Sequence, residues 1–199
     1  MESDEYKTIS DKKTGEGCYT EKRSKFLAFA HHAETAEQAK ELATLYKKKY
    51  FDARHVCFAY MLGNERNEYR CNDDGEPSGT AGKPILGQIN KNELTNIFIA
   101  VIRYFGGVKL GTGGLAVAYR TAASLAISDA ITETRHVEEK VDCLFPYEML
   151  DSVMRVVKDM QPRIISQDYG NTCSITLSIR KAEADKLRNR LENVLISKQ

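Results

Sequence analysis

A long apolar segment, a glycine-rich loop and an alanine-rich segment follow one another and constrain the fold of this chain most. Residues 97–105 (IFIAVIRYF) are apolar apart from Arg103 and rich in β-branched and aromatic side chains. This composition predicts a strand that is buried on both faces. Residues 115–130 place Leu115, Tyr119 and several alanines on one face, which predicts a buried helix. We therefore expect a strand, a loop and a helix at the centre of the fold.

The expected loop contains five glycines: Gly106, Gly107, Gly111, Gly113 and Gly114. Glycine permits positive φ angles and lets another backbone or a ligand approach closely. The loop also opens a helix, whose first N–H groups have no partner within the helix and attract anions such as phosphate. A tight strand-to-helix turn that binds nothing is also compatible with this pattern.

Basic side chains could add positive charge to an anion site at this loop. We expect an anion- or RNA-binding site formed by the five glycines together with Arg54, Arg103, Lys109 and Arg120. A P-loop is not predicted, because Thr112 stands where that motif has its phosphate-binding lysine. A dinucleotide-binding fold is not predicted either, because the glycine-rich connection is long and no parallel strand with an acidic end follows.

Composition limits the classes of function that this chain can have. Of the 199 residues, 42% are hydrophobic and 29% are charged, and the formal net charge is +1. Binding of nucleic acid would therefore need a local basic patch. No apolar run approaches the roughly 20 residues that span a bilayer, and the polar start is unlike a secretory signal, so we expect a cytoplasmic protein without membrane contact. The five widely spaced cysteines indicate neither a zinc site nor a disulfide framework.

The segment before the central strand is predicted to be rich in β-structure. Residues 5–34 are predicted to form a β-meander with a turn at Gly15-Glu16-Gly17. Thr35, followed by Gln38 at capping-box spacing, predicts the start of a helix that ends in three lysines. Further predicted elements are strands at 6–9, 24–32, 54–62 and around 69–71, and a short helix at 84–90.

An acidic segment at 72–84 is too rich in glycine and proline to form a regular element. Asp73, Asp74 and Glu76 are candidate ligands for a divalent cation, and Mg²⁺ is the only cofactor that the sequence suggests, although Arg70 disrupts the EF-hand order. His55 and Glu76 are candidate catalytic residues for proton transfer. The alternatives are a solvated acidic loop and a structural histidine.

A charged run at 132–140 marks the predicted boundary between a domain at 1–136 and a domain at 137–199. The second part is predicted to contain strands at 141–147, 163–169 and 172–180 and helices at 148–160 and 182–196. The order β-α-β-β-α predicts a split-βαβ module of about 60 residues. Full alternation at 172–180 predicts one polar sheet face, which could contact RNA together with the basic residues that follow.

Three segments closely resemble motifs of the IMPACT family, whose bacterial members are often called YigZ. They are RHVCFAY at 54–60, DDGEPSGTAG at 73–82 and RYFGGVKLGTGGL at 103–115. The resemblance implies an α+β fold with two domains. The first would share its fold with a small-subunit ribosomal protein, elongation factor G domain IV and small-metabolite kinases, and the second would be ferredoxin-like. Eukaryotic relatives damp a starvation-sensing kinase pathway by binding its activator and so regulate translation.

The function favoured by the residues and the resemblance is non-enzymatic regulation of translation. The protein would bind RNA, the ribosome or a translation factor through the glycine-rich, anion-receiving loop. The alternative is an enzyme or sensor for a small phosphorylated or nucleotide ligand, with the loop holding phosphate and the acidic segment holding a divalent cation. A protein–protein adaptor is a third interpretation.

Overall fold

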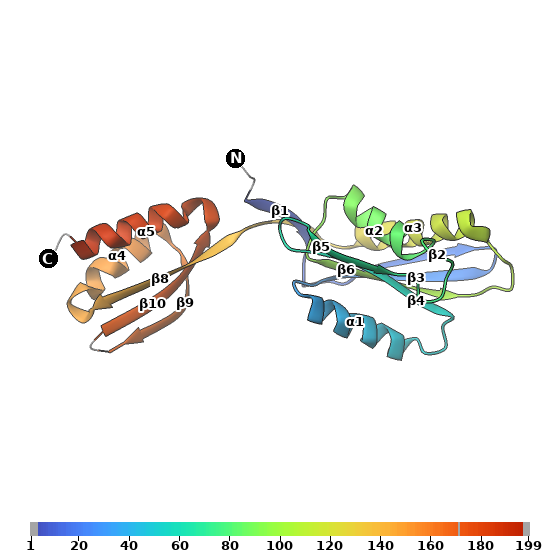
Figure 1. Cartoon of the computed structure of the whole chain (residues 1–199), viewed down its shortest axis with the longest axis horizontal. Coiled ribbons are helices and arrows are strands. Elements are labelled where there is room, and N and C mark those ends of the chain that lie inside the picture. Colours follow the sequence, from blue (N-terminus) through green and yellow to red (C-terminus); the bar gives the residue numbers. More distant parts are fainter. Residues whose placement is uncertain (1–3, 171, 197–199) are drawn as a thin grey trace. The chain divides into compact units, whose positions relative to one another are not determined.

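The computed structural model describes residues 4–170 and 172–196. They form two compact units, one made of Tyr6–Arg135 and the other made of the residues from His136 onward together with Asp4 and Glu5. Each unit combines helices with an antiparallel sheet, which confirms the predicted α+β fold class (Figure 1). The boundary between domains that fold independently, placed after residue 136 from the sequence, stays a prediction. Within the described ranges, no helix has the length and apolar content needed to span a bilayer.

The larger unit is built on a five-stranded antiparallel sheet in the order β2-β3-β6-β4-β5. Its strands are β2 (Gly15–Glu21), β3 (Ser24–His32), β4 (His55–Leu62), β5 (Glu68–Asn72) and β6 (Ile97–Tyr104). The central strand β6 is buried from Ile97 to Arg103, as predicted. Helices cover both faces: α1 (Ala36–Lys49) lies on one, and α2 (Gly82–Lys91) and α3 (Gly111–Asp129) lie on the other (Figure 1).

Helix α3 packs closely on β2 because both elements present small residues. A Cβ atom on Gly15 would lie 2.2 Å from the carbonyl oxygen of Ala126, and one on Gly17 would lie 2.7 Å from that of Ala122. The predicted turn at residues 15–17 is therefore wrong, since this segment is strand. The glycines serve the close approach of a helix backbone instead of a reversal of the chain.

The start of the chain pairs with a distant segment. Strand β1 (Glu5–Ile9) forms a separate two-stranded sheet with β7 (Thr132–His136). The predicted β-meander over residues 5–34 is therefore wrong for its first strand, although β2 and β3 do form a hairpin. The cap of α1 is as predicted, because the side-chain oxygen of Thr35 accepts a hydrogen bond from the Gln38 N–H at 3.2 Å.

The smaller unit has a three-stranded sheet in the order β8-β10-β9, with β10 antiparallel to both neighbours. Its elements are β8 (Glu138–Pro146), a 3₁₀ turn at Tyr147–Met149, α4 (Leu150–Met160), β9 (Arg163–Tyr169), β10 (Thr172–Arg180) and α5 (Lys181–Ile196). This order and pairing are ferredoxin-like, as predicted. Cys173, Ile175, Leu177 and Ile179 of β10 are buried, as predicted for one face of this strand. The alternation is incomplete, because Ser178 on the other face is buried as well.

Candidate functional site

A buried ion pair lies where the acidic segment meets the end of β6. The Nη1 atom of Arg103 is 2.6 Å from Oε1 of Glu76, and the Tyr119 hydroxyl donates to the same oxygen at 2.9 Å. The Arg103 and Glu76 side chains are only 6% and 3% exposed. The guanidinium also lies over the rings of Phe26 and Phe105, 5.6 and 5.5 Å from their centroids. Arg103 therefore neutralises Glu76 in the interior. This corrects the position expected for Arg103 beside the exposed loop.

His55 lies next to this ion pair at the start of β4. Its Nδ1 atom is 2.7 Å from the carbonyl oxygen of Asp74, which can only accept a hydrogen bond. The neutral ring therefore carries its proton on Nδ1 and leaves Nε2 unprotonated. The Nε2 atom is 3.8 Å from Oε1 of Glu76, too far for a hydrogen bond. The structure thus brings the two candidate catalytic residues together, with Glu76 already bonded to other partners.

Two further buried groups complete this cluster. The Sγ atom of Cys57 is 3.4 Å from the Tyr119 hydroxyl and 3.0 Å from the carbonyl oxygen of Asp73. Burial raises the pKa of the Cys57 thiol and that of the Tyr119 hydroxyl far above their ordinary values. Both groups therefore stay protonated at neutral pH and act as donors, so the cluster holds no thiolate nucleophile.

Asp73 binds backbone amides at the start of α2. Its carboxylate accepts hydrogen bonds from the N–H groups of Gly79, Ala81 and Gly82 at 2.8, 3.0 and 2.8 Å. Burial favours a raised pKa for Asp73, but the three amides outweigh it and hold the pKa below its ordinary value. Asp73 is therefore a cap for α2, and the acidic segment is folded around it.

The carboxylates of Asp74 and Glu76 bind different partners from the carboxylate of Asp73. One oxygen of Asp74 accepts from the Val56 N–H at 2.8 Å, and the other is 2.6 Å from the Lys47 Nζ atom. In the part of the chain that the structure describes, no three His, Cys, Asp or Glu side chains are grouped so as to hold a metal ion. The arrangement does not assemble Asp73, Asp74 and Glu76 into one ligand set, and the Mg²⁺ site stays a prediction.

The glycine-rich segment is divided between a loop and a helix. Because α3 begins at Gly111, residues Gly111, Gly113 and Gly114 form its first turn, which corrects their expected place in the loop. Gly106 stays in the loop and packs on the β2–β3 turn, where a Cβ atom would lie 2.0 Å from the backbone carbon of Arg23. Gly107 is exposed and has a φ angle of +85°, which glycine adopts without strain.

The N-terminus of α3 is open to solvent. Gly111, Thr112 and Gly113 are exposed, the preceding Leu110 provides no side-chain cap, and the first turn contains no acidic residue. The N–H groups of this turn and the positive end of the helix dipole are therefore not neutralised by the protein. This is the geometry that the predicted anion site requires.

Exposed cations gather at the same end of the five-stranded sheet. The register places Lys25 of β3 opposite Tyr104 of β6, and His55 of β4 opposite Arg103, so β3 and β4 begin where β6 ends. Exposed cations of this end include Lys22, Arg23, Lys25, Arg54 and Lys109. No residue within the described ranges forms an ion pair with any of them. These five cations and the first turn of α3 are called the basic end below.

The basic end differs from the predicted site in its cations. The sequence predicts Arg54 and Lys109 at this site but not Lys22, Arg23 and Lys25, because these three lie far earlier in the chain. Arg120 is exposed, but it lies nine residues beyond Gly111 and thus about 13 Å further along the helix axis, on its opposite side. Arg120 is therefore not a neighbour of the open amides.

Comparisons with known proteins bear on the family of this chain. A model of the Impact N-terminal domain matches residues 22–127. A relative from Haemophilus influenzae described as an IMPACT family member is 33% identical over 175 residues, which cover 85% of this chain and 84% of the relative. The IMPACT family member YigZ of Escherichia coli is 33% identical over 150 residues, or 74% of each chain. A crystal structure described as that of a hypothetical protein has a TM-score of 0.75 at 26% identity and covers 96% of this chain and 92% of its own. The chain therefore belongs to the IMPACT family.

Proposed function

We propose that this protein is a non-enzymatic regulator of translation that binds RNA, the ribosome or a translation factor through the basic end. The chain belongs to the IMPACT family, and the resemblance to that family implies the role in translation. One observation carries the binding role: the uncapped N-terminus of α3 lies at the same sheet end as five exposed cations that have no ion-pair partner among the described residues.

Phosphate groups of RNA fit this surface chemically. Backbone N–H groups at a helix N-terminus and the side chains of lysine and arginine are the usual protein donors to phosphate oxygens. The net charge of the chain is only +1, so binding of phosphate would rely on a local group of cations such as the basic end provides. Contacts of this kind position a protein on RNA without reading its sequence, which suits the binding of a structured surface such as the ribosome.

Salt-dependent binding tests the proposal. Co-sedimentation with ribosomes and fluorescence anisotropy with a structured RNA should both show binding that falls steeply between about 50 and 200 mM salt. The triple variant Arg23→Gln/Arg54→Gln/Lys109→Gln should bind more weakly. Its slope of log K against log salt should become shallower by roughly one unit for each phosphate that the variant no longer neutralises.

Arg120→Gln provides the matched control, because Arg120 is an exposed cation on α3 outside the basic end. It should leave the affinity nearly unchanged. Binding that ignores salt, or an equal effect of the triple variant and the control, would contradict the proposal.

A further inference from the structure

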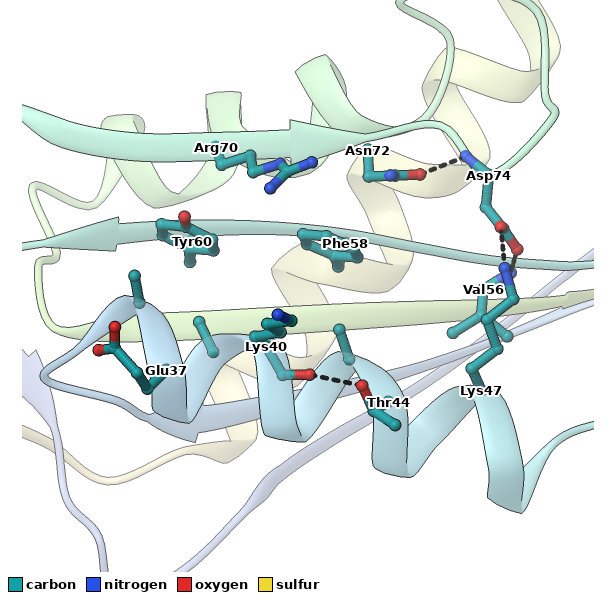
Figure 2. Close-up of a pocket in the computed structure, with 13 residues that line it drawn as sticks. Glu37, Lys40, Thr44, Lys47, Val56, Phe58, Tyr60, Arg70, Asn72 and Asp74 are labelled. Carbon is teal, nitrogen blue, oxygen red and sulfur yellow. Dashed lines mark hydrogen bonds and ion pairs between the residues drawn. The ribbon is translucent and has the colours of Figure 1, made fainter.

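A groove lies between α1 and the strands β4 and β5, on the sheet face opposite to α2 and α3 (Figure 2). Its volume is about 440 Å³, within the range of sites for small ligands. Phe58 and Tyr60 of β4 form its floor, and both are only partly buried. None of the residues of the basic end lines this groove.

Alanines on α1 keep the groove open. Ala36, Ala39 and Ala43 all line it, and their spacing of three and four residues places them on one stripe of the helix. Methyl groups at these positions leave space between the helix and β4 that longer apolar side chains would fill. The aromatic floor is therefore accessible because the facing helix presents small side chains.

Two cations that have no ion-pair partner in the described part of the chain border the groove. Figure 2 shows the guanidinium of Arg70 on the β5 side and the Lys40 side chain on the α1 side. Both residues are exposed, and neither has a side-chain hydrogen bond or an ion pair within the described ranges. By contrast, Lys47 is held by Asp74 at 2.6 Å. Glu37 is the other acidic residue of the lining, so the groove keeps an excess of positive charge.

We propose that this groove binds a single unstacked nucleotide, with the base against Phe58 and Tyr60 and the phosphate between Lys40 and Arg70. Aromatic side chains that stack on a base and cations that contact its phosphate are the usual combination at sites for unpaired nucleotides. The same ligand chemistry is present in a free nucleotide and in one residue of single-stranded RNA. An acidic peptide would use the cations but has no need of the aromatic floor.

Titration with nucleotides tests the assignment. The four nucleoside 5′-monophosphates and a short single-stranded oligoribonucleotide are added separately to the full chain, and binding is followed by calorimetry and by fluorescence anisotropy.

Ala43→Leu should obstruct the groove without removing charge, and Lys40→Gln/Arg70→Gln should remove both cations. Each is expected to weaken binding about tenfold, the size of effect expected when one stacked base or its phosphate is no longer held. Circular dichroism checks that each variant is folded, and Ala36→Leu replaces Ala43→Leu if that variant is not.

Lys91→Gln is the matched control, because Lys91 is exposed on α2 on the other sheet face. It should change the affinity by less than about twofold, since only the general electrostatic attraction is altered. Binding of monophosphates supports a free nucleotide as ligand, and binding of the oligonucleotide alone supports single-stranded RNA.

Three results would overturn the proposal: no binding of either ligand, binding that Ala43→Leu leaves unchanged, or capture of an oligoglutamate peptide in place of nucleotides. The triple variant of the basic end should still bind monophosphates in the groove. The nucleotide site and the proposed contact with the ribosome can therefore fail separately.

Discussion

Arg103 and Glu76 form an ion pair inside the larger unit, with the Nη1 and Oε1 atoms 2.6 Å apart and both side chains more than nine-tenths buried. The two residues come from different elements, β6 and the segment before α2. A charge that is buried without its counter-charge is costly, so each residue requires the other. The ion pair therefore holds the acidic segment against the central strand β6.

Breaking this pair should destabilise the protein strongly. Arg103→Met leaves the Glu76 carboxylate buried without a cation, and Glu76→Gln leaves the guanidinium without an anion. Each single variant should lose about 3–5 kcal/mol of unfolding free energy, measured by urea denaturation. The double variant should lose much less than the sum of the two. Additive losses would show that the two side chains do not depend on each other.

The Asp73 cap makes stability depend on pH. Asp73→Asn should lower the unfolding free energy by about 1–2 kcal/mol near neutral pH, because one amide oxygen replaces two carboxylate oxygens that bind three N–H groups. The folded-state pKa of Asp73 is lowered, so its contribution is complete above the pKa of an unfolded aspartate and is lost as the pH falls through the lowered value. The difference between wild type and variant should therefore shrink in acid.

Urea titrations of Asp73→Asn at about pH 7 and about pH 3 measure this difference. The exposed Asp11→Asn serves as control and should have little effect at either pH. A difference that grows in acid would contradict the assigned role of Asp73.

Two glycines of the larger unit should respond to alanine with opposite signs. A Cβ atom on Gly17 would lie 2.7 Å from backbone atoms of α3, which cannot move cheaply, so Gly17→Ala should lose about 1–3 kcal/mol. Gly87 lies in α2, and a Cβ atom there would meet no described atom within 4 Å apart from its chain neighbours and the nearby backbone of its own helix, so Gly87→Ala should gain up to about 1 kcal/mol from helix propensity. Thermal unfolding measures both, and a shift of the same sign in both variants would contradict the close packing of α3 on β2.

A negative charge in the first turn of α3 should raise the stability of the protein but weaken its binding of RNA or ribosomes. Thr112→Glu should stabilise the helix by about 0.3–1 kcal/mol, because a carboxylate complements the helix dipole. The same change should weaken binding of RNA or ribosomes, since the carboxylate competes with phosphate for the open amides. Val117→Glu, at an exposed position further along α3, is the control and should affect both quantities less. Unchanged binding by Thr112→Glu would show that these amides do not receive phosphate.

Much of the fold could be predicted because its signals are local. Strand β6 is apolar throughout except at Arg103, β10 alternates between apolar and polar residues, and Thr35 with Gln38 forms a cap within four residues. The turn predicted at Gly15-Glu16-Gly17 fails for a non-local reason, since these glycines are required by the backbone of α3. The pairing of β1 with β7 joins the two ends of the larger unit, and no local pattern indicates it.

In the candidate site, too, features with local signals could be predicted and features that depend on distant residues could not. The open start of α3 could be predicted from its glycines, although the helix begins earlier than expected. The burial of Arg103 could not be predicted, because it depends on Glu76 in another segment and on the rings of Phe26 and Phe105. Lys22, Arg23 and Lys25 join the site only through the pairing of β3 with β6, which becomes visible in the register of the sheet.

The smaller unit depends on residues from the start of the chain. The Nε and Nη2 atoms of Arg180, at the end of β10, donate to the two carboxylate oxygens of Asp4 at 2.6 and 2.7 Å. The guanidinium lowers the pKa of Asp4 to about 2, so this carboxylate stays charged over most of the pH range. A fragment cut out at residue 137 would lack this counter-ion. Chimaeras that exchange the C-terminal unit between members of the family should therefore also transfer the segment around Asp4.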